Sequence, residues 1–360
     1  MYLDRGGPVA VVMGLAAAQA AVGDRVTVVC RGQLRPGEVK SRAHELGPGV
    51  ELLEVGPSGG RELASALDRL RPEYLHIHGV WEPLQRWCAD WAYNRGVPWV
   101  LSTHGMLHPV PMSKGWLKKR AYLFLLGRAV WSARRLLVTS LEEREYATKI
   151  TGVSAVVLVN GVNVAEFTDA DPDAFVHANP QFSNRPYLLF LGRIHAIKGI
   201  TGLVRAFALA RQRGLDADLV LAGPPDGAEG DVTQLAHVLG VAGDVHLVGP
   251  LYGEEKIAAL AGCAMFVHRP NYEGFGMTVI EAMASSRPVV TTNACGVARE
   301  LAQGMLDVSE DTDTAFAEAI LHRHSADLAD TEAMTTRGRI WVQQNLSWDA
   351  VAREARALYR

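Results

Sequence analysis

The sequence predicts an α/β protein of two domains, each built on a doubly wound parallel sheet, and three observations carry this prediction. Short runs rich in Val, Ile and Leu alternate with helix-like segments, as in parallel sheets covered by helices on both faces. The alternation breaks once, at residues 168–186, in a segment rich in Asp, Asn and Pro. The chain has 360 residues, 48% of them hydrophobic, which suffices for two domains of ordinary size.

The first domain is predicted over residues 1–168, with helical segments such as RELASALDRL at 61–70 between its strands. Only MYLD precedes the glycine pair Gly6-Gly7, so the first strand is expected to be very short or to lie upstream of this sequence. The predicted strands of this domain are DRVTVVC (24–30), EYLHIHG (73–79), PWVLSTHG (98–105) and RLLVTS (135–140).

The second domain is predicted over residues 187–344, after a linker at 169–186. The tail at 345–360, NLSWDAVAREARALYR, is predicted to form a final amphipathic helix. Two such domains in series leave a cleft, and ligands of these folds bind beyond the carboxyl ends of the strands. The predicted strands of this domain are YLLFLGR (187–193), ADLVLAG (217–223), DVHLVG (244–249), MFVHRP (265–270) and RPVVTT (287–292).

The composition argues against several classes of protein. A net charge of -3 gives no basic excess for binding nucleic acid. The four cysteines form no C-x-x-C pair, so a disulfide framework or structural zinc site is not expected, and a reducing cytosol is favoured. The first residues lack the order of a signal peptide, and the apolar stretches are too short or too interrupted to span a bilayer. We therefore expect a cytoplasmic protein.

The stretch NYEGFGMTVIEAMASSRPVV, residues 271–290, follows an apolar strand and holds two acids, Glu273 and Glu281. Its glycines allow a ligand to approach the backbone, and the start of the following helix suits phosphate or sugar oxygens. Glu281 falls in an uncharged, apolar helix, where a carboxylate needs donors. Two interpretations stay open: Glu281 binds the hydroxyls of a ligand, or it forms a salt bridge with Arg287 or another base.

Further candidate residues follow strand ends. Arg193 and Lys198, five residues apart, suit a diphosphate, although they can equally be solvated surface charges. His104 follows a strand and faces the expected cleft, unless it is a hydrogen-bonded structural histidine. His76 and His78 share one strand face, but two ligands without a third do not make a zinc site.

A basic and aromatic cluster spans Lys114 to Arg135. It is either an interfacial patch that meets anionic lipid or an ordinary helix with solvated charges. Three D-x-D triplets, at 171–173, 216–218 and 311–313, are discounted as metal sites because they fall in the linker, at a strand's beginning and before a helix. No metal site is predicted.

In this order the motifs resemble those of the retaining glycosyltransferases of family 4, which have the GT-B fold. The likeness covers nearly the whole chain, and the E-x₇-E segment combined with G-R-x₄-K is its most specific part. The motifs are Gly6-Gly7, STHG (102–105), NGV (160–162), LGRIHAIKG (191–199) and EGFGMTVIE (273–281).

The resemblance implies two Rossmann-like domains facing across a cleft, with the nucleotide-sugar donor on the second and the acceptor on the first. The final helix would pack back on the first domain. There are departures from the family pattern. Asn163 stands where Asp is usual, His268-Arg269 where a Pro-Ser pair is common, and Ser286-Arg287 where a small residue and Gly are usual. Contacts with the base or the sugar are therefore expected to differ.

The resemblance also implies roles for individual residues. Arg193 and Lys198 would bind the donor diphosphate, Glu273 the hydroxyls of the transferred sugar, and Glu281 those of the ribose. His104 would reach the transferred sugar from the first domain. The amides of Gly274, Phe275 and Gly276 would face sugar and phosphate, and the pair Gly6 and Gly7 would lie close to phosphate or acceptor. The region from Val248 to Leu251 is a candidate for contacts with the base.

The implied chemistry is sugar transfer with retention from a UDP- or GDP-sugar to a hydroxyl of a glycan, lipid-linked sugar or small molecule, without a metal or other cofactor. Front-face attack needs no carboxylate nucleophile, and Arg193 and Lys198 would stabilise the leaving diphosphate. If the cluster from Lys114 to Arg135 meets the inner membrane face, a lipid-linked acceptor in surface polysaccharide synthesis is expected, and if it does not, a soluble acceptor is expected. Two alternatives stay open: a nucleotide-sugar epimerase on the same fold, and a non-catalytic sugar-nucleotide-binding protein.

Overall fold

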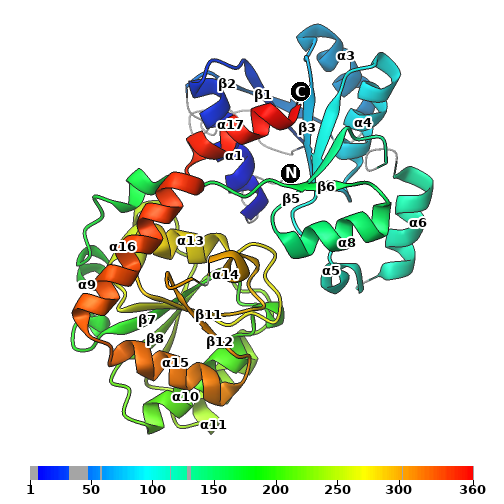
Figure 1. The fold of residues 1–360 in the computed structure, drawn as a ribbon. Helices are drawn as coiled ribbons and strands as arrows, with labels where there is room; N and C mark the ends of the chain where they lie inside the picture. Colours follow the sequence, from blue (N-terminus) through cyan, green and yellow to red (C-terminus); the bar gives the residue numbers. More distant parts are fainter. Residues whose placement is uncertain are drawn as a thin grey trace. The chain divides into compact units, whose positions relative to one another are not determined.

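The computed structural model describes residues 7–31, 48–56, 59–113, 115–127, 131–301 and 303–359. The chain divides into two compact units: unit 1 comprises Met1–Gly161 with Leu346–Arg360, and unit 2 comprises Val162–Asn345. Each unit is built around parallel β-sheet with helices packed on it, which confirms the predicted α/β class (Figure 1).

Unit 2 holds a six-stranded sheet in the order β12-β11-β10-β7-β8-β9, with every neighbouring pair parallel. All residues of β7 and β8 are buried, as expected for strands covered on both faces. The order reverses between β7 and β10, which is the topological switch point of a doubly wound sheet. The strands are β7 (Tyr187–Leu191), β8 (Asp218–Ala222), β9 (Val245–Gly249), β10 (Met265–His268), β11 (Val289–Thr292) and β12 (Asp307–Ser309).

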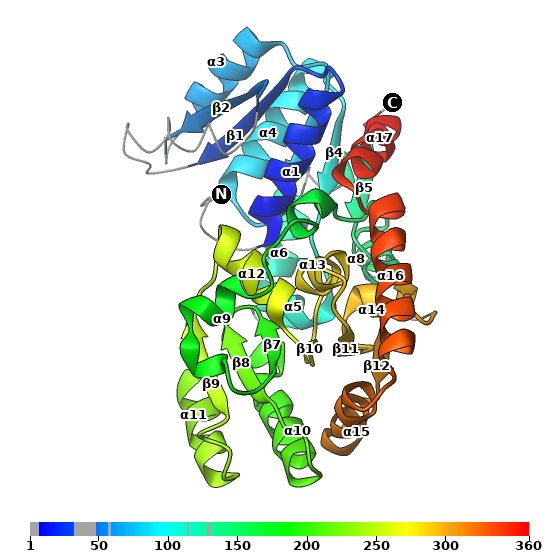
Figure 2. The same cartoon turned by 90° about the vertical axis from the view of Figure 1, so that its left-hand side faces the viewer.

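Helices cover both faces of this sheet (Figure 2). Helix α10 packs against α11 and α15 on one face, and α13 packs against α12 and α16 on the other. The helices are α10 (Ile200–Gln212), α11 (Glu229–Val238), α12 (Gly253–Gly262), α13 (Met277–Ala284), α14 (Gly296–Leu301), α15 (Asp313–His324) and α16 (Leu328–Asn345).

The segment predicted as a linker at 169–186 packs as part of unit 2. It follows the short helix η2 (Val164–Phe167) and contains α9 (Ala174–Ala178) and η3 (Pro180–Phe182). The rings of Phe175 and Phe182 stack, with centroids 5.8 Å apart, and both contact Tyr187 on β7. All three side chains are buried. Two widely spaced aromatic residues among polar ones therefore anchor a segment whose composition suggests a loop.

Unit 1 holds a parallel pair of strands and a four-stranded parallel sheet, β3-β4-β5-β6. Strands β2 and β6 lie outside the predicted set, whereas the other four coincide with predicted runs. The strands are β1 (Val26–Arg31), β2 (Val50–Val55), β3 (Leu75–His78), β4 (Trp99–Ser102), β5 (Arg135–Val138) and β6 (Ala155–Val157). The helices are α1 (Gly7–Ala21), α3 (Gly60–Leu70), α4 (Pro83–Arg95), α5 (Pro109–Ser113), α6 (Trp116–Leu126) and α8 (Leu141–Thr151).

The final helix, α17 (Trp348–Tyr359), belongs to unit 1 and packs beside α1, as Figure 1 shows in red and blue. The indole of Trp348 lies so close to Gly14 and Gly161 that a Cβ at either glycine would overlap it. Tyr359 accepts a hydrogen bond from Gln19 Nε2, with 2.8 Å between the atoms. Helix α17 thus completes the core of unit 1. Among the described residues, no helix has both the length and the apolar character needed to cross a membrane.

Candidate functional site

The candidate site lies at the carboxyl edge of the unit 2 sheet, where β7 and β10 are paired neighbours. Open α/β sheets bind ligands at such a reversal of strand order. Arg193 and Lys198 follow β7, and Glu273 follows β10. Leu251 is half-buried and follows β9, two strands from β7. Lys198 and Glu273 therefore meet at the switch point, and Arg193 and Leu251 lie along the same edge.

Lys198 and Glu273 form an ion pair in which Nζ contacts Oε2. Lys198 ends the short helix η4 (Ala196–Lys198), which the side chain of His195 caps. The next residue, Gly199, has a φ of 64°, and a Cβ there would overlap the carbonyl of Arg269. Glycine thus lets the loop after β7 press against the segment after β10, which brings the two side chains together.

Glu273 is held ionised by its neighbours. Burial raises the pKa of its carboxyl, but Lys198 and then His268 more than offset this and lower the pKa to about 2. His268 Nε2 lies 3.4 Å from the same Oε2 atom that Lys198 contacts. The carboxylate is only 18% exposed. A buried, charged acid with two basic neighbours on one oxygen keeps its second oxygen for another donor.

His268 is almost completely buried, at 1% exposure. Its ring stacks near the rings of Phe190 and Phe266, with centroids 5.8 Å and 6.3 Å away. Neither ring nitrogen has a hydrogen-bond partner within the part of the chain that the structure describes. Burial lowers the pKa of His268, and the neighbouring Glu273 only partly counteracts this. The imidazole is therefore neutral at physiological pH.

The backbone of the EGFG segment is fixed by the loop after β11. Glu273 N–H donates to Ala294 O over 3.0 Å, and Val297 N–H donates to Phe275 O over 2.9 Å. Gly276 has a φ of 102°, and a Cβ there would lie 2.5 Å from Cys295 Sγ, so only glycine fits this start of α13. The Phe275 side chain is buried. Its amide, rather than its ring, is the group this segment can offer to a ligand.

Glu281 forms a salt bridge, but with a residue that sequence reasoning did not name. Its Oε1 accepts from Lys256 Nζ over 2.9 Å, whereas Arg287 donates to the Ser285 carbonyl. The side chain of Glu281 is 13% exposed. Its Oε2 is buried and has no hydrogen-bond partner among the described residues. The salt-bridge interpretation is correct for one oxygen, and the other remains able to accept from a ligand.

Lys256 lies on α12, just after Glu254 and Glu255 in the first turn. Such a charged turn is typical of a solvated helix start, so nothing in the local sequence separates Lys256 from a surface lysine. Its contact with Glu281 depends on how α12 and α13 pack.

Arg193 is half-exposed and forms an ion pair with Asp226, with 2.6 Å between Nη1 and Oδ2. Asp226 follows β8, and the bridge between Ile194 and Pro225 holds the two loops together. Each candidate diphosphate ligand of unit 2, Arg193 and Lys198, thus already has an acidic partner.

Arg269 binds residues of α10 and of the start of α15. Its guanidinium donates to Gly202 O over 2.6 Å and to Asp311 and Asp313 over 3.0 Å and 2.5 Å, so it bonds the start of α15 to α10. At this position the departure from the family pattern therefore has a structural role. Of the two residues that depart, His268 is the one that lies beside Glu273.

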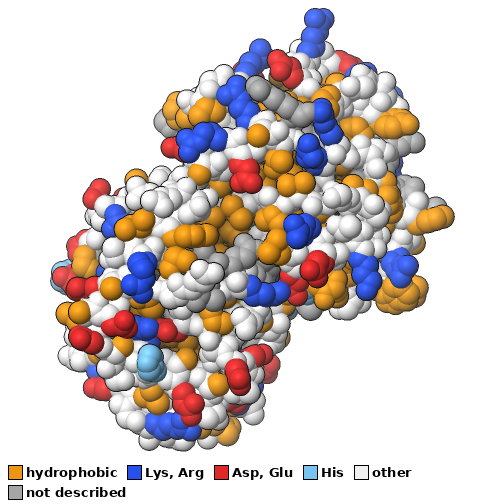
Figure 3. Space-filling model, viewed as in Figure 1, with side chains coloured by type: hydrophobic (Ala, Val, Ile, Leu, Met, Phe, Trp, Pro, Cys, Tyr) orange, Lys and Arg blue, Asp and Glu red, His pale blue; other side chains and the backbone are white. Residues whose placement is uncertain are grey.

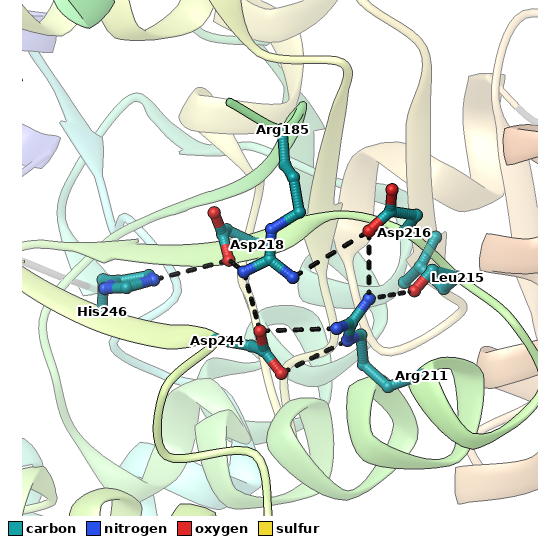
Figure 4. A network of polar contacts seen from close by, with 7 residues as sticks. All are labelled: Arg185, Arg211, Leu215, Asp216, Asp218, Asp244 and His246. Atoms are coloured by element: carbon teal, nitrogen blue, oxygen red, sulfur yellow. Dashed lines mark hydrogen bonds and ion pairs between the residues drawn. The ribbon is translucent and has the colours of Figure 1, made fainter. Parts of the chain in front are cut away.

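Two of the three D-x-D triplets, those at 216–218 and 311–313, pair with arginines. Asp216 and Asp218, together with Asp244, pair with Arg185 and Arg211 at the amino ends of the strands, opposite the candidate site (Figure 4). Asp311 and Asp313 pair with Arg269, as described above. Within the described residues, no group of three or more His, Cys, Asp or Glu side chains is arranged to hold a metal ion.

In unit 1, His104 lies beside His78. The Nδ1 atom of His78 is 3.0 Å from His104 Nε2, so one ring donates to the other. His76, on the same strand, is bonded to Tyr359 Oη and Ser102 Oγ over 2.8 Å and 2.7 Å. The three histidines and Ser102 line a cavity of about 10 Å³, room for about one water molecule. Burial lowers the pKa of His104 to about 4 and that of His76 to about 3.

Glu143 supports the turn that carries His104, and sequence reasoning missed it. Its buried carboxylate accepts hydrogen bonds from Thr139 N–H over 2.8 Å, from Thr103 Oγ1 over 2.5 Å, and from Gly105 N–H. His104 itself has a φ of 49°, a left-handed conformation that costs energy for a residue with a Cβ. The S-x-x-E spacing of Ser140 and Glu143 is a signal for a helix start, which does not reveal this long-range clamp.

The basic and aromatic cluster is only partly a surface patch. On α6, Trp116, Leu117 and Phe124 are exposed, Phe124 at 85%, and Arg120 lies over the Trp116 ring. Figure 3 shows basic and apolar side chains side by side in the region of α6. Arg135 instead donates to the Leu358 carbonyl on α17. Lys114 lies outside the described residues, as does Gly6, and Gly7 is the first residue of α1.

Two family models match the sequence. A model described as "Glycosyl transferase 4-like domain" matches residues 6–161, and one described as "Glycosyl transferases group 1" matches residues 185–325. The D-inositol 3-phosphate glycosyltransferase of Streptomyces avermitilis is 30% identical over 313 residues, 79% of this chain and 63% of that protein. The chain spans 45% to 63% of the length of the first proteins of this name that it matches.

A further relative covers more of the chain at lower identity. The GDP-mannose:cellobiosyl-diphosphopolyprenol alpha-mannosyltransferase of Komagataeibacter xylinus is 22% identical over 337 residues, 91% of this chain and 81% of that protein. Among solved structures, Anabaena HepE in complex with UDP-glucose matches with a TM-score of 0.78 and 18% identity, covering 99% of this chain and 96% of that one. At such identity the likeness shows a shared fold.

Proposed function

Because the chain belongs to the family 4 glycosyltransferases of GT-B fold, we propose that it moves a sugar from a nucleoside-diphosphate sugar to an acceptor hydroxyl, with retention at the anomeric carbon. The observation that carries this proposal is the pairing of Lys198 with Glu273 beside Arg193 at the switch point of unit 2. A diphosphate needs cations there, and a sugar needs an acceptor for its hydroxyls.

In this proposal the donor is held by unit 2. Arg193 and Lys198 bind the diphosphate, and the free oxygen of Glu273 accepts from the hydroxyls of the transferred sugar. The unpaired Oε2 of Glu281 is a ready acceptor for a ribose hydroxyl. The amides of Gly274, Phe275 and Gly276 face sugar and phosphate, and the base lies toward Leu251.

The negative charge that develops on the departing diphosphate is stabilised by Lys198, by Arg193 and by the N-terminus of α13. Because these groups belong to the chain itself, we propose that the reaction needs no metal ion. The acceptor attacks from the face that the diphosphate leaves, and a departing phosphate oxygen takes the acceptor proton. One oxygen of Glu273 is paired with Lys198 and lies beside His268. Such a carboxylate suits a binding role better than the role of a nucleophile.

Unit 1 would contribute His104. A neutral His104, whose tautomer is set by His78, can donate one hydrogen bond to a sugar hydroxyl. We place Gly7, the first residue of α1, near the donor phosphate or the acceptor, together with its sequence neighbour Gly6.

The test is a binding screen with UDP-, GDP-, ADP- and dTDP-sugars by calorimetry, followed by assays of transfer and donor hydrolysis. Binding of a UDP- or GDP-sugar is expected, given that HepE binds UDP-glucose and that a relative is named for GDP-mannose. Glu273→Ala and Lys198→Ala should each lower turnover by about 10²-fold or more, and Glu254→Gln, an exposed acid on α12, should not. Absence of binding to every nucleotide sugar would refute the proposal.

The exposed face of α6 favours an acceptor at a membrane surface. Its apolar side chains Trp116, Leu117 and Phe124 lie beside Lys118, Lys119 and Arg120, a combination suited to the interface of anionic lipids. Co-sedimentation with vesicles of phosphatidylglycerol should exceed that with phosphatidylcholine, and Phe124→Glu should reduce it. Equal sedimentation with both lipids would favour a soluble acceptor.

A further inference from the structure

The charged groups of the candidate donor site cancel in pairs. Arg193 is bonded to Asp226, and Lys198 to Glu273. Among the described residues, the site therefore offers a diphosphate two cations whose charges are already balanced by two acids. A bound diphosphate adds negative charge beside Glu273, and in a partly buried site this is costly unless positive charge is added too.

His268 is the ionisable side chain placed to add that charge. Its Nε2 lies 3.4 Å from the Glu273 oxygen that Lys198 contacts, so both bases lie beside one carboxylate oxygen. On β11, the register partner of His268 is Thr291, whose buried hydroxyl has no hydrogen-bond partner in the described part of the chain. The nearby thiol of Cys295 stays neutral, because burial raises its pKa to about 12.

We propose that His268 takes up a proton when the diphosphate of a nucleotide sugar binds Lys198, and then serves as the second cationic partner of Glu273. The inference rests on the proposed function. It makes His268 a positioning residue: it acts through Glu273 and does not touch the reacting atoms.

The reason is that a bound diphosphate changes the electrostatic interactions around Glu273 and His268. Once Lys198 shares its charge with a diphosphate, Glu273 loses part of its stabilisation, and His268 loses part of the repulsion from the lysine. Both changes favour the imidazolium, which then holds the carboxylate ionised and oriented toward the sugar. The phenyl rings of Phe190 and Phe266 exclude water around the histidine, which strengthens the pair.

The experiment is calorimetric titration with UDP-glucose and with GDP-mannose at pH 7, in buffers that differ in ionisation enthalpy. The slope of heat against buffer enthalpy measures the protons taken up. Nucleotide sugars are used rather than free UDP, since their diphosphate has no group that titrates near neutral pH. We expect uptake approaching about one proton per donor, and an affinity that falls by up to about tenfold per unit of rising pH.

Two variants identify the residue. His268→Gln should abolish the proton uptake and flatten the pH dependence, and His268→Phe, which matches its aromatic neighbours, should do the same if glutamine unfolds the chain. His195→Asn, which keeps a capping side chain on η4, should leave the uptake unchanged.

The outcomes separate this inference from the proposed function. Binding by the wild type without proton uptake, or uptake that persists in His268→Gln, overturns the role of His268 while leaving the glycosyltransferase proposal intact. Failure of the wild type to bind either nucleotide sugar refutes the proposed donor site and this inference with it.

Discussion

Lys256 and Glu281 form an ion pair across two helices of unit 2, with 2.9 Å between Nζ and Oε1, and the second oxygen of Glu281 stays buried without a hydrogen bond from any described residue. The pair fixes the orientation of the Glu281 carboxylate, and with it the position of Oε2, the oxygen that has no partner among the described residues.

The pair gives a prediction for nucleotide affinity. Glu281→Gln should weaken nucleotide-sugar binding by about 10-fold or more, because a charged hydrogen bond contributes about 1.5–3 kcal/mol. Lys256→Met should weaken it less, and should also lower stability by about 1 kcal/mol, since it leaves a partly buried acid unpaired. Calorimetry and urea denaturation measure both effects. Equal affinity of Glu281→Gln and wild type would exclude a ribose contact.

Glu143 gives a prediction for the stability of unit 1. Glu143→Ala removes the acceptor of Thr103, Gly105 and Thr139, and should cost about 3 kcal/mol or more. Glu143→Gln keeps the shape and should cost less, while turnover falls because the turn of His104 loosens. Glu145→Gln, on the exposed side of the same helix, is the matched control. A stable Glu143→Ala with full activity would contradict the clamp.

Ser286 gives a prediction of stabilisation. It has a φ of 54° just after α13, where a left-handed conformation suits glycine. Ser286→Gly should therefore raise the free energy of unfolding by roughly 0.5–1 kcal/mol. Ser285→Gly is the control, because Ser285 has a φ of -78° and donates to Glu281 O, so it should destabilise. If both substitutions destabilise, strain at Ser286 is not the reason.

The buried histidines of unit 1 predict a loss of stability in mild acid. The pKa values of His76 and His104 fall from 6.5 to about 3 and about 4 on folding, because burial disfavours their charged forms. Below pH 6.5 the unfolded chain binds more protons, so stability decreases as pH falls from about 6.5 toward 4, by up to about 1.4 kcal/mol per pH unit for each histidine.

Urea midpoints at pH 7.5, 6 and 5 measure this slope, and His104→Asn should reduce it. Glu273 acts in a different window: its depressed pKa of about 2, against 4.5 for the free group, contributes stability that is lost only below about pH 4.5. An unchanged slope in His104→Asn would show that this ring is charged or accessible in the folded protein.

The strand pattern predicted that Arg193, Lys198 and Glu273 lie at one edge of the unit 2 sheet, because parallel strands bring their carboxyl ends to one edge whatever lies between them in sequence. Arg193, Lys198 and Glu273 each follow such a strand, so this placement needed no knowledge of side-chain contacts. Lys256 and Glu143 escaped prediction because each acts through a partner on another element, Glu281 and the turn at Gly105.

Composition gave a wrong prediction where the packing of a segment depends on only two residues. The segment at 169–186 has the Asp, Asn and Pro content of a linker, and Phe175 and Phe182 nevertheless bury it against Tyr187.

The departure from the family pattern at His268-Arg269 led to the expectation of different base or sugar contacts. Arg269 is instead bonded to Gly202 on α10 and Asp313 on α15, because it follows His268 and alternates to the opposite face.

The packing of α17 on α1 sets an order of events during synthesis. Gln19 and His76 are both hydrogen-bonded to Tyr359 Oη, and Trp348 fills the space beside Gly14 and Gly161. A ribosome must therefore translate all of unit 2 before unit 1 has the residues that close its core. Residues 162–345 of unit 2 are continuous in the sequence, so unit 2 can fold before α17 is available to complete unit 1.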